Sequence, residues 1–241
     1  FGELGSVNPI FCLPQAMQTR AGALAQGWAA SLTMGAGQFC TNPGIAFVIA
    51  GAQANEFAEA SIAALSGAGA QAMLTDGIAS AYRHGTNAVA SAAHVEPLFT
   101  TESVGRTALP NLFRVSLEHW LHSPDLQEEV FGPLGIIVEA NDIDEMVAAA
   151  GAIEGQLTCT LQMEDGDKAH AQRLLPHLER KAGRVLVNGF PTGVEVAGAM
   201  VHGGPYPAST NFGATSVGTM AIRRFLRPVC YQNMPADLLP A

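Results

Sequence analysis

The cysteine at position 40 is the residue whose type and setting point most directly to chemistry. It lies in the glycine-rich segment Gly35–Gly44, between a stretch that favours a helix and a run that favours a buried strand. Glycine-rich turns at strand ends expose side chains and let a substrate approach the backbone closely. A cysteine there can act as a nucleophile, although most free cysteines are small apolar core residues. Residue types alone leave both interpretations open.

The other three cysteines are Cys12, Cys159 and Cys230, and each lies among apolar residues in the sequence. We therefore expect Cys40 to be the most accessible of the four, on a loop, and the first to be alkylated. The scattered spacing predicts neither a disulfide framework nor a metal cage. Unpaired cysteines fit a reducing, cytoplasmic setting best.

Acidic and histidine residues give weaker signals. Glu3 is a single charge near the start of the chain. In Glu128–Pro133, two adjacent acidic residues are followed directly by an apolar Gly-Pro turn. By composition alone, a solvated charge and an acidic loop are the simpler interpretations. The seven histidines show no metal-ligand spacing, so we expect no metal site. No Gly-x-Gly-x-x-Gly element follows a strand, so a dinucleotide fingerprint is not visible.

The elements that must position these residues alternate between two types. Helical patterns and β-branched runs predict an α/β fold, a three-layer open and mainly parallel sheet flanked by helices. The expected helices are Gln15–Met34, Glu56–Leu65, Gln71–Tyr82, Asp142–Ala150 and Lys168–Leu178. The expected strands are Ile45–Ala50, Leu112–Ser116, Leu134–Glu139, Leu157–Gln162 and Val185–Asn188.

Composition and charge exclude several classes of protein. The chain has 241 residues, of which 48% are hydrophobic and 14% charged, enough to bury a sizeable core. Its net charge of −9 opposes binding to nucleic acid and to anionic membranes, so we expect neither partner. The most apolar stretch, Ala23–Gly37, is too short and too polar to span a membrane.

Four motifs together resemble the aldehyde dehydrogenase superfamily. They are Glu3-Leu-Gly5, Gly37-Gln-Phe-Cys-Thr-Asn-Pro-Gly44, Glu128-Glu-Val-Phe-Gly-Pro133 and Gly183-Arg-Val-Leu-Val-Asn188, in the family's order and spacing. The resemblance implies that Cys40 is the nucleophile and Glu3 the general base. It also implies that Glu129 and Phe131, with a backbone contact from Leu4, hold the nicotinamide end of NAD or NADP.

The resemblance also suggests a substrate. Ser6-Val-Asn-Pro9 and Gly193–Tyr206 look like the branch of the family that oxidises 2-oxoglutarate semialdehyde, with succinate semialdehyde or a fatty aldehyde as the alternatives. By the same resemblance, Phe39, Thr41 and His202 line the aldehyde pocket. The implied enzyme is an NAD(P)-dependent aldehyde dehydrogenase that forms a thiohemiacetal and then a thioester on cysteine.

The resemblance implies a catalytic domain over residues 1–219 and a C-terminal strand and tail over 220–241. The chain starts at Phe1, where the family's cofactor domain ends, so we expect that domain to be absent and the isolated chain to be inactive. We expect a homo-oligomer, with Met220–Tyr231 as a pairing strand. Two alternatives remain, a cysteine hydrolase and a non-catalytic fragment. A cysteine hydrolase would need a histidine base near Cys40, and no local motif supplies one.

Overall fold

A computed structural model describes residues 1–240. Its main sheet has seven strands in the order β4-β6-β7-β2-β1-β8-β9, all parallel except β4, which runs antiparallel to β6. These strands are β1 (Ile10–Cys12), β2 (Ile45–Ile49), β4 (Glu96–Phe99), β6 (Asn111–Ser116), β7 (Leu134–Ala140), β8 (Gln156–Gln162) and β9 (Ala182–Val187). The expected α/β class with a mainly parallel sheet is confirmed.

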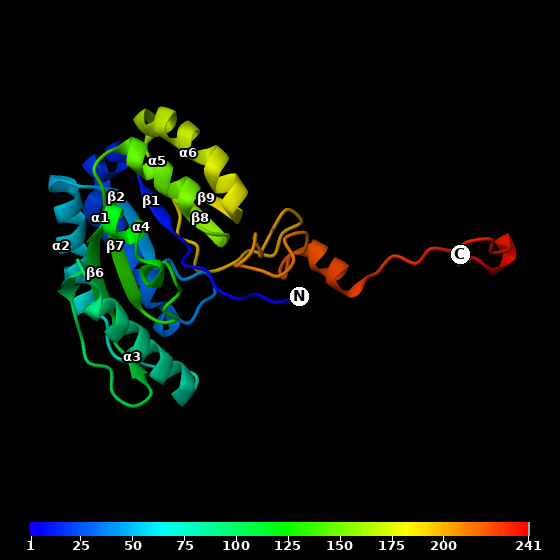
Figure 1. Cartoon of the computed structure of the whole chain (residues 1–241), viewed down its shortest axis with the longest axis horizontal. Helices are drawn as coiled ribbons and strands as arrows, with labels where there is room; N and C mark the ends of the chain where they lie inside the picture. The colour runs from blue at the N-terminus through cyan, green and yellow to red at the C-terminus, as the bar shows by residue number, and fades with distance from the viewer. Residues whose placement is uncertain (241) are drawn as a thin grey trace.

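Helices cover both faces of the sheet, which gives three layers (Figure 1). One face packs against α1 (Pro14–Thr33) and α2 (Ala52–Ser66). The other packs against α3 (Asp76–Ser91), α4 (Leu117–Leu121), α5 (Ile143–Ala152) and α6 (Lys168–Lys181). None of the described helices is long and apolar enough to cross a membrane.

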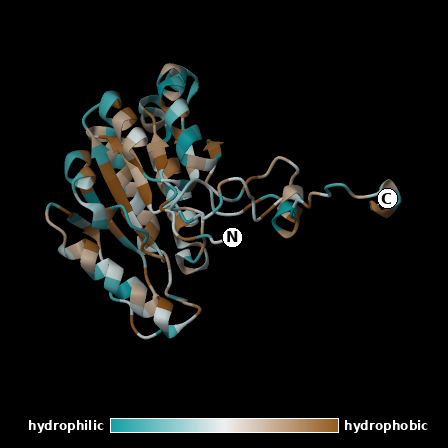
Figure 2. Cartoon of the chain, turned by 45° about the vertical axis from the view of Figure 1, so that its right-hand side comes forward, coloured by the Kyte–Doolittle hydropathy of each residue, from teal (hydrophilic) through white to brown (hydrophobic). Residues whose placement is uncertain are grey.

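Side-chain alternation explains why the central strands are apolar throughout. In β1, Phe11 packs into the core under α3–α6, whereas Ile10 and Cys12 pack under α1 and α2. A strand buried on both faces needs no polar residues, and Figure 2 shows the strands as the most hydrophobic part of the ribbon. A continuous apolar run is therefore compatible with a central strand that helices cover on both faces.

The helices and strands expected between Gln15 and Asn188 agree with the structure except in the region of residues 71–91. The expected helix Gln71–Tyr82 is wrong at its start, because α3 begins at Asp76 and continues to Ser91. The Thr75 side chain accepts a hydrogen bond from the Ile78 N–H, which fixes the first turn at that point. Before it, Gln71–Ala72 form a short strand, β3, which pairs with β5 (Thr107–Ala108).

The C-terminal segment also departs from expectation. Residues 219–225 form a 3-10 helix and 226–231 are irregular, so the expected strand Met220–Tyr231 is wrong. A strand needs a neighbouring edge to pair with, and this segment pairs with none of the strands within residues 1–240. It projects from the body of the molecule as an extension (Figure 1), and this leaves Cys230 exposed.

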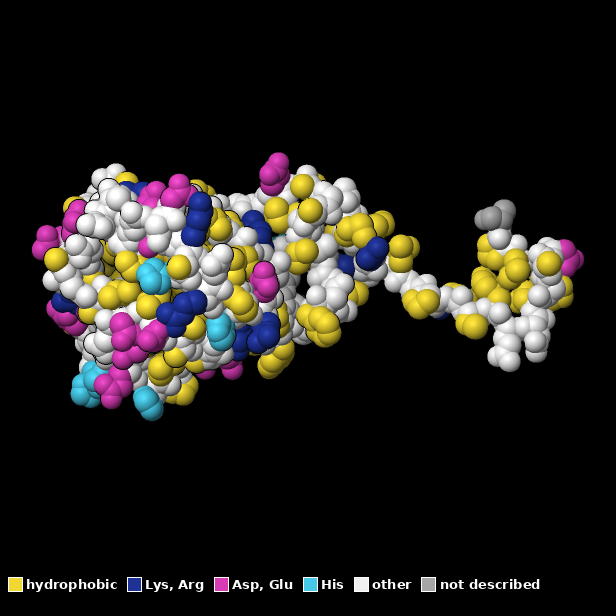
Figure 3. Space-filling view, turned by 90° about the horizontal axis from the view of Figure 1, so that it is seen from above, with side chains coloured by type: hydrophobic (Ala, Val, Ile, Leu, Met, Phe, Trp, Pro, Cys, Tyr) yellow, Lys and Arg dark blue, Asp and Glu magenta, His cyan; other side chains and the backbone are white. Residues whose placement is uncertain are grey.

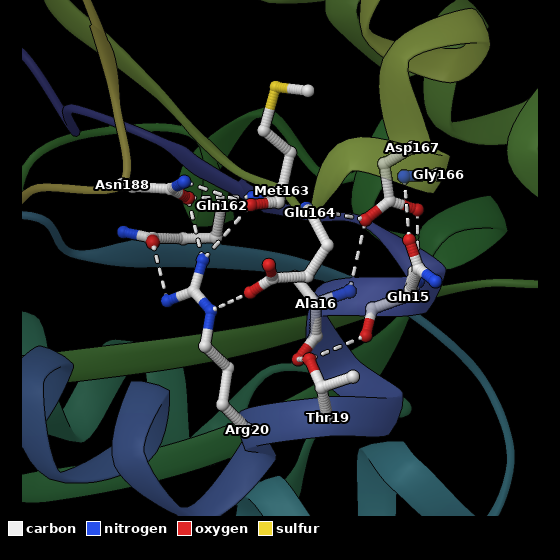
Figure 4. A network of polar contacts seen from close by, with 10 residues as sticks. All are labelled: Gln15, Ala16, Thr19, Arg20, Gln162, Met163, Glu164, Gly166, Asp167 and Asn188. Carbon is white, nitrogen blue, oxygen red and sulfur yellow. Dashed lines mark hydrogen bonds and ion pairs between the residues drawn. The ribbon is translucent and has the colours of Figure 1, made fainter.

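A polar network ties the start of α1 to the loop after β8 (Figure 4). Asp167 accepts hydrogen bonds from the backbone N–H groups of Gln15 and Ala16, which compensates unpaired donors at the helix start. Arg20 bonds Glu164 at 2.6 Å, and its own φ of −149° interrupts the helix. This network fixes α1, the helix that leads into the turn with Cys40.

Candidate active site

The candidate residues converge because they precede parallel strands. Glu3 precedes β1, Cys40 precedes β2, and Glu129 and Phe131 precede β7. Because the amino ends of parallel strands meet at one edge of a sheet, these segments lie together. The network of Arg20 and Asp167 lies at the opposite, carboxyl edge, at the end of β8.

The Gly35–Gly44 turn, which carries Cys40, is held against the turn Glu129–Pro133. After α1 the backbone passes through three residues with positive φ, and at the third, Gly37, a Cβ atom would collide with the Gly132 carbonyl group. The Asn42 amide donates to the carbonyls of both glycines, at 2.8 Å to Gly37 and 3.3 Å to Gly132. Glycine is therefore required by both the conformation and the space.

Asn8 clamps the backbone on the other side of Cys40. It is fully buried, with a φ of 48°. Its Nδ2 lies 2.9 Å from the Cys40 carbonyl oxygen and 3.0 Å from that of Asn42, and its Oδ1 accepts from Ser6 and Thr158. The segment after Glu3 is thus bonded directly to the turn that carries Cys40.

Gln156 completes this buried network at the start of β8. Its Oε1 accepts hydrogen bonds from the Ser6 hydroxyl and from the backbone N–H groups of Val7 and Asn8. Three donors on one oxygen fix the path of the chain from Ser6 into β1. The approach of the Glu3 segment to Cys40 therefore rests on the buried side chains of Asn8 and Gln156.

His202 reaches the site along the segment that follows β9. The Leu4 N–H donates to the Ala208 carbonyl at 3.1 Å, and Glu3 forms an isolated bridge with Ser209. The His202 N–H donates to the Thr215 hydroxyl. These bonds lay residues 202–215 beside the Glu3 segment at the amino edge of the sheet.

Cys40, His202 and Glu3 form one cluster. The His202 Nε2 atom lies 3.2 Å from the Cys40 sulfur and 3.2 Å from Glu3 Oε2. The hydrogen bonds to Cys40 and Glu3 raise the pKa of His202 to about 9 against the effect of burial. The hydrogen bond from His202 lowers the pKa of Glu3, so this carboxylate remains ionised at neutral pH.

An open pocket of about 320 Å³ adjoins the cluster, lined by Glu3, Leu4, Gly5, Ser6, Cys40, Glu129, Phe131 and Leu157. Burial raises the pKa of Glu129 to about 7, and the Ser6 N–H, which points to its carboxylate at 3.4 Å, acts in the opposite direction. The pocket brings together residues that the sequence predicts for base, nucleophile and cofactor contact.

The remaining predicted residues, Phe39 and Thr41, do not line this pocket. Phe39 is half-buried and Thr41 is buried, both next to Cys40 in its turn. Cys40 is on a loop as expected, but the prediction that it is the most accessible cysteine is wrong, because Cys230 is exposed and Cys40 only partly so. The cause is the extended C-terminal segment, which leaves the apolar residues around Cys230 outside the core.

Sequence reasoning missed Asn8, Gln156 and Arg184. A buried amide is recognisable only once its acceptors are known, and those lie far away in the chain. Arg184 is held by the carbonyls of Pro191 and Gly193. Burial lowers its pKa, while the charge interaction with Cys40 opposes that shift, so the Arg184 cation interacts with the Cys40 side chain.

Known proteins match the chain over its whole length. No family model matches. The chain is 49% identical, over its full length, to alpha-ketoglutaric semialdehyde dehydrogenase 2 of Azospirillum brasilense. It is 43% identical to alpha-ketoglutaric semialdehyde dehydrogenase of Acinetobacter baylyi. In both comparisons it spans only 46% of the relative's length.

Solved structures share the fold. Aldehyde dehydrogenase C from Pseudomonas syringae has a TM-score of 0.76 at 19% identity, covering 93% of this chain and 46% of the other. Gamma-glutamyl-gamma-aminobutyraldehyde dehydrogenase from Burkholderia cenocepacia has a TM-score of 0.75 at 20% identity, covering 92% and 44%. Sequence similarity over the whole of this chain, together with a shared fold, places it in the aldehyde dehydrogenase superfamily.

Proposed function

We propose that this chain is the catalytic part of an NAD(P)-dependent aldehyde dehydrogenase that oxidises a semialdehyde to its carboxylic acid. The observation that carries the proposal is the Cys40 sulfur 3.2 Å from His202, with Glu3 within the same cluster. A thiol, a basic group and a carboxylate are the three functions that capture of an aldehyde and hydrolysis of a thioester require.

The pocket residues fit the nicotinamide riboside end of NAD or NADP. Glu129 would accept hydrogen bonds from the ribose, Phe131 would pack against it, and the Leu4 backbone would contact the carboxamide. The supporting observation is that all three line the pocket that also contains Cys40. When bound there, NAD(P)⁺ would supply the hydride acceptor for the oxidation.

The protein's own residues perform the other steps. The Cys40 sulfur adds to the aldehyde carbon, and His202 holds the proton that the thiol gives up. Among residues 1–240 the Cys40 N–H has no hydrogen-bond acceptor, so it is available to the oxyanion. After oxidation the thioester carbon is attacked by water, whose proton passes to Glu3, and the acid leaves as the Cys40 thiol re-forms.

The substrate that we propose is 2-oxoglutarate semialdehyde. Both relatives described above carry this semialdehyde in their names under its other form, alpha-ketoglutaric semialdehyde. The cation at Arg184 near Cys40 suits an aldehyde that also bears a carboxylate. Succinate semialdehyde meets the same electrostatic requirement, whereas a fatty aldehyde does not.

We also propose the division into a catalytic domain, 1–219, and a tail, 220–241, that serves association between copies. The exposed apolar side chains of the tail support this role. All four cysteines are free, which suits a reducing compartment such as the cytoplasm.

The Cys40–His202 pair also raises the possibility of a cysteine hydrolase. The base that no local motif supplies comes from 162 residues further along the chain. In a hydrolytic triad, however, the acid binds the ring nitrogen that faces away from the nucleophile. Here Glu3 and Cys40 both face Nε2, so Glu3 does not orient the ring in that way. This geometry favours a separate role for Glu3 as the base toward water.

Protection of Cys40 by an aldehyde tests the proposal. The chain is treated with iodoacetamide with and without 2-oxoglutarate semialdehyde, and each cysteine is quantified by peptide mass spectrometry. We expect the aldehyde to slow labelling of Cys40 but not of Cys230, because only Cys40 lies in the pocket. The same measurement is repeated with succinate semialdehyde and with a fatty aldehyde. The degree to which each aldehyde slows labelling of Cys40 ranks the three as substrates.

Equal labelling of Cys40 with and without every aldehyde would contradict the proposed function. 2-Oxoglutarate, which lacks the aldehyde group, is the matched control and should leave the rate of Cys40 labelling unchanged.

A further inference from the structure

The donor atoms of Glu3, Cys40 and His202 meet the requirements of a metal site as well as those of catalysis. A carboxylate oxygen, the Cys40 sulfur and the His202 ring nitrogen all lie within 4.8 Å of one another. We propose that this cluster binds Zn²⁺ and that the bound ion blocks the nucleophile. The proposal rests on ligand geometry and does not require the proposed function to be correct.

The distances are close to those of a tetrahedral zinc site. Zinc lies about 2.3 Å from sulfur and about 2.0–2.1 Å from nitrogen, so a tetrahedral angle separates those two donors by about 3.6 Å. The Cys40 sulfur and His202 Nε2 are 3.2 Å apart, as are His202 Nε2 and Glu3 Oε2. These two donor pairs therefore need shifts of only a few tenths of an ångström to admit the ion, and the third pair, the Cys40 sulfur and the Glu3 carboxylate, lies within 4.8 Å.

The orientation of His202 favours coordination. One ring nitrogen, Nε2, faces both the sulfur and the carboxylate, so an ion between these groups meets donors on three sides. The ring is 6% exposed and its backbone is held by Thr215, which limits its movement. A site with its histidine already in place loses less conformational entropy when the metal binds.

The chemistry of the donors selects zinc over the common hard cations. Thiolate and imidazole suit borderline and soft ions, whereas magnesium and calcium prefer oxygen ligands. Cys40 and His202 would each lose a proton to solvent on coordination, because the ligands are the thiolate and the neutral imidazole. Three protein ligands leave a fourth position, and the pocket of about 320 Å³ beside Cys40 and Glu3 provides room for water there.

Bound zinc would prevent the proposed capture of an aldehyde, because the sulfur lone pair that attacks the carbonyl would be held by the ion. The same coordination would protect Cys40 from alkylation. This yields a readout on the thiol that needs neither cofactor nor turnover.

Titration with metal ions tests the site. We expect isothermal titration of the chain with Zn²⁺ to show one site per chain, and Co²⁺ to give the thiolate-to-metal absorption band. Cys40→Ser should abolish that band, and His202→Ala and Glu3→Gln should each weaken zinc binding by about tenfold or more. Cys230→Ser and His84→Ala, both at exposed positions, are the controls and should bind as the parent chain does.

Three results would overturn the proposal. They are no binding of Zn²⁺ below millimolar concentration, binding that survives Cys40→Ser, and binding lost in Cys230→Ser. Circular dichroism of each variant shows whether it folds. If His202→Ala does not fold, Glu3→Gln, which keeps the size of the side chain, replaces it as the test of the ligand set. Failure of zinc binding would leave aldehyde protection of Cys40 unaffected, so this proposal and the proposed function fail separately.

Discussion

His202 Nε2 is the atom at which the candidate site comes together. It contacts the sulfur of Cys40 and the carboxylate of Glu3, residues that lie 162 and 199 positions away in the chain. The sequence indicated Cys40 by its glycine-rich turn, and family resemblance indicated Glu3 and His202. That all three meet at one ring nitrogen depends on the return of the chain after β9, which no local pattern reveals.

Substitution of Asn8 tests the hydrogen bonds that hold the turn with Cys40. Asn8→Ala removes the donors to the Cys40 and Asn42 carbonyls and places alanine at a φ of 48°. We expect a loss of about 1–3 kcal/mol in the free energy of unfolding, measured in urea, because buried acceptors lose their partner. We also expect slower alkylation of Cys40, since the turn that carries it is released.

The matched control is Asn87→Ala, an exposed position in α3, which should change stability by no more than about 0.5 kcal/mol. A second variant, Asn8→Asp, keeps the size of the side chain but points oxygen at carbonyl oxygens. If Asn8→Asp were as stable as the parent chain, the clamp would not exist.

At the scale of elements, local patterns in the sequence predicted strands and helices. The strand expected at Ile45–Ala50 and the helix expected at Asp142–Ala150 both appear, because each depends on neighbouring residues. Strand β1 was missed since only three residues form it. Its central place in the sheet comes from pairing with β2 and β8, which are distant in sequence.

The close contact between the turn at Gly37 and the turn at Gly132 can be tested by substitution. Gly37→Ala would place a Cβ against the Gly132 carbonyl at a φ of 67°. We expect a loss of about 2 kcal/mol or more in unfolding free energy, from backbone strain and overpacking. Thermal and urea unfolding measure it.

Gly22→Ala is the control, because nothing lies within 4 Å of a Cβ at that position in α1. It should leave stability unchanged or raise it by about 0.5–1 kcal/mol. A Gly37→Ala chain as stable as the parent would show that the two turns are not in contact.

At the scale of the whole molecule, the C-terminal extension stands apart. Apolar side chains gather on it in Figure 3, and Phe225 and Leu226 are 83% and 67% exposed. The sequence identified this stretch as apolar and basic but not as an irregular arm, because the strand it suggested needs a pairing edge. Both edges of the main sheet, β4 and β9, are strands with one free side within residues 1–240.

We expect the chain to form a dimer or larger assembly in solution through this arm. Burial of apolar side chains acts at short range, whereas repulsion from the net charge of −9 is screened beyond about 8 Å at physiological salt. Light scattering at micromolar concentration measures the mass. Phe225→Asp with Leu226→Asp should shift it toward monomer, and a monodisperse monomer of the parent chain would rule the interface out.

Competition between Cys40 and Cys230 for an alkylating agent tests most directly whether Cys40 is an activated nucleophile. The chain is exposed to limiting iodoacetamide at neutral pH, and the labelled peptides are quantified over time. Cys230 is the more exposed of the two, so accessibility alone predicts that it reacts first. Activation by His202 predicts that Cys40 reacts first, whereas labelling of Cys230 ahead of an unreacted Cys40 would show that Cys40 is not activated.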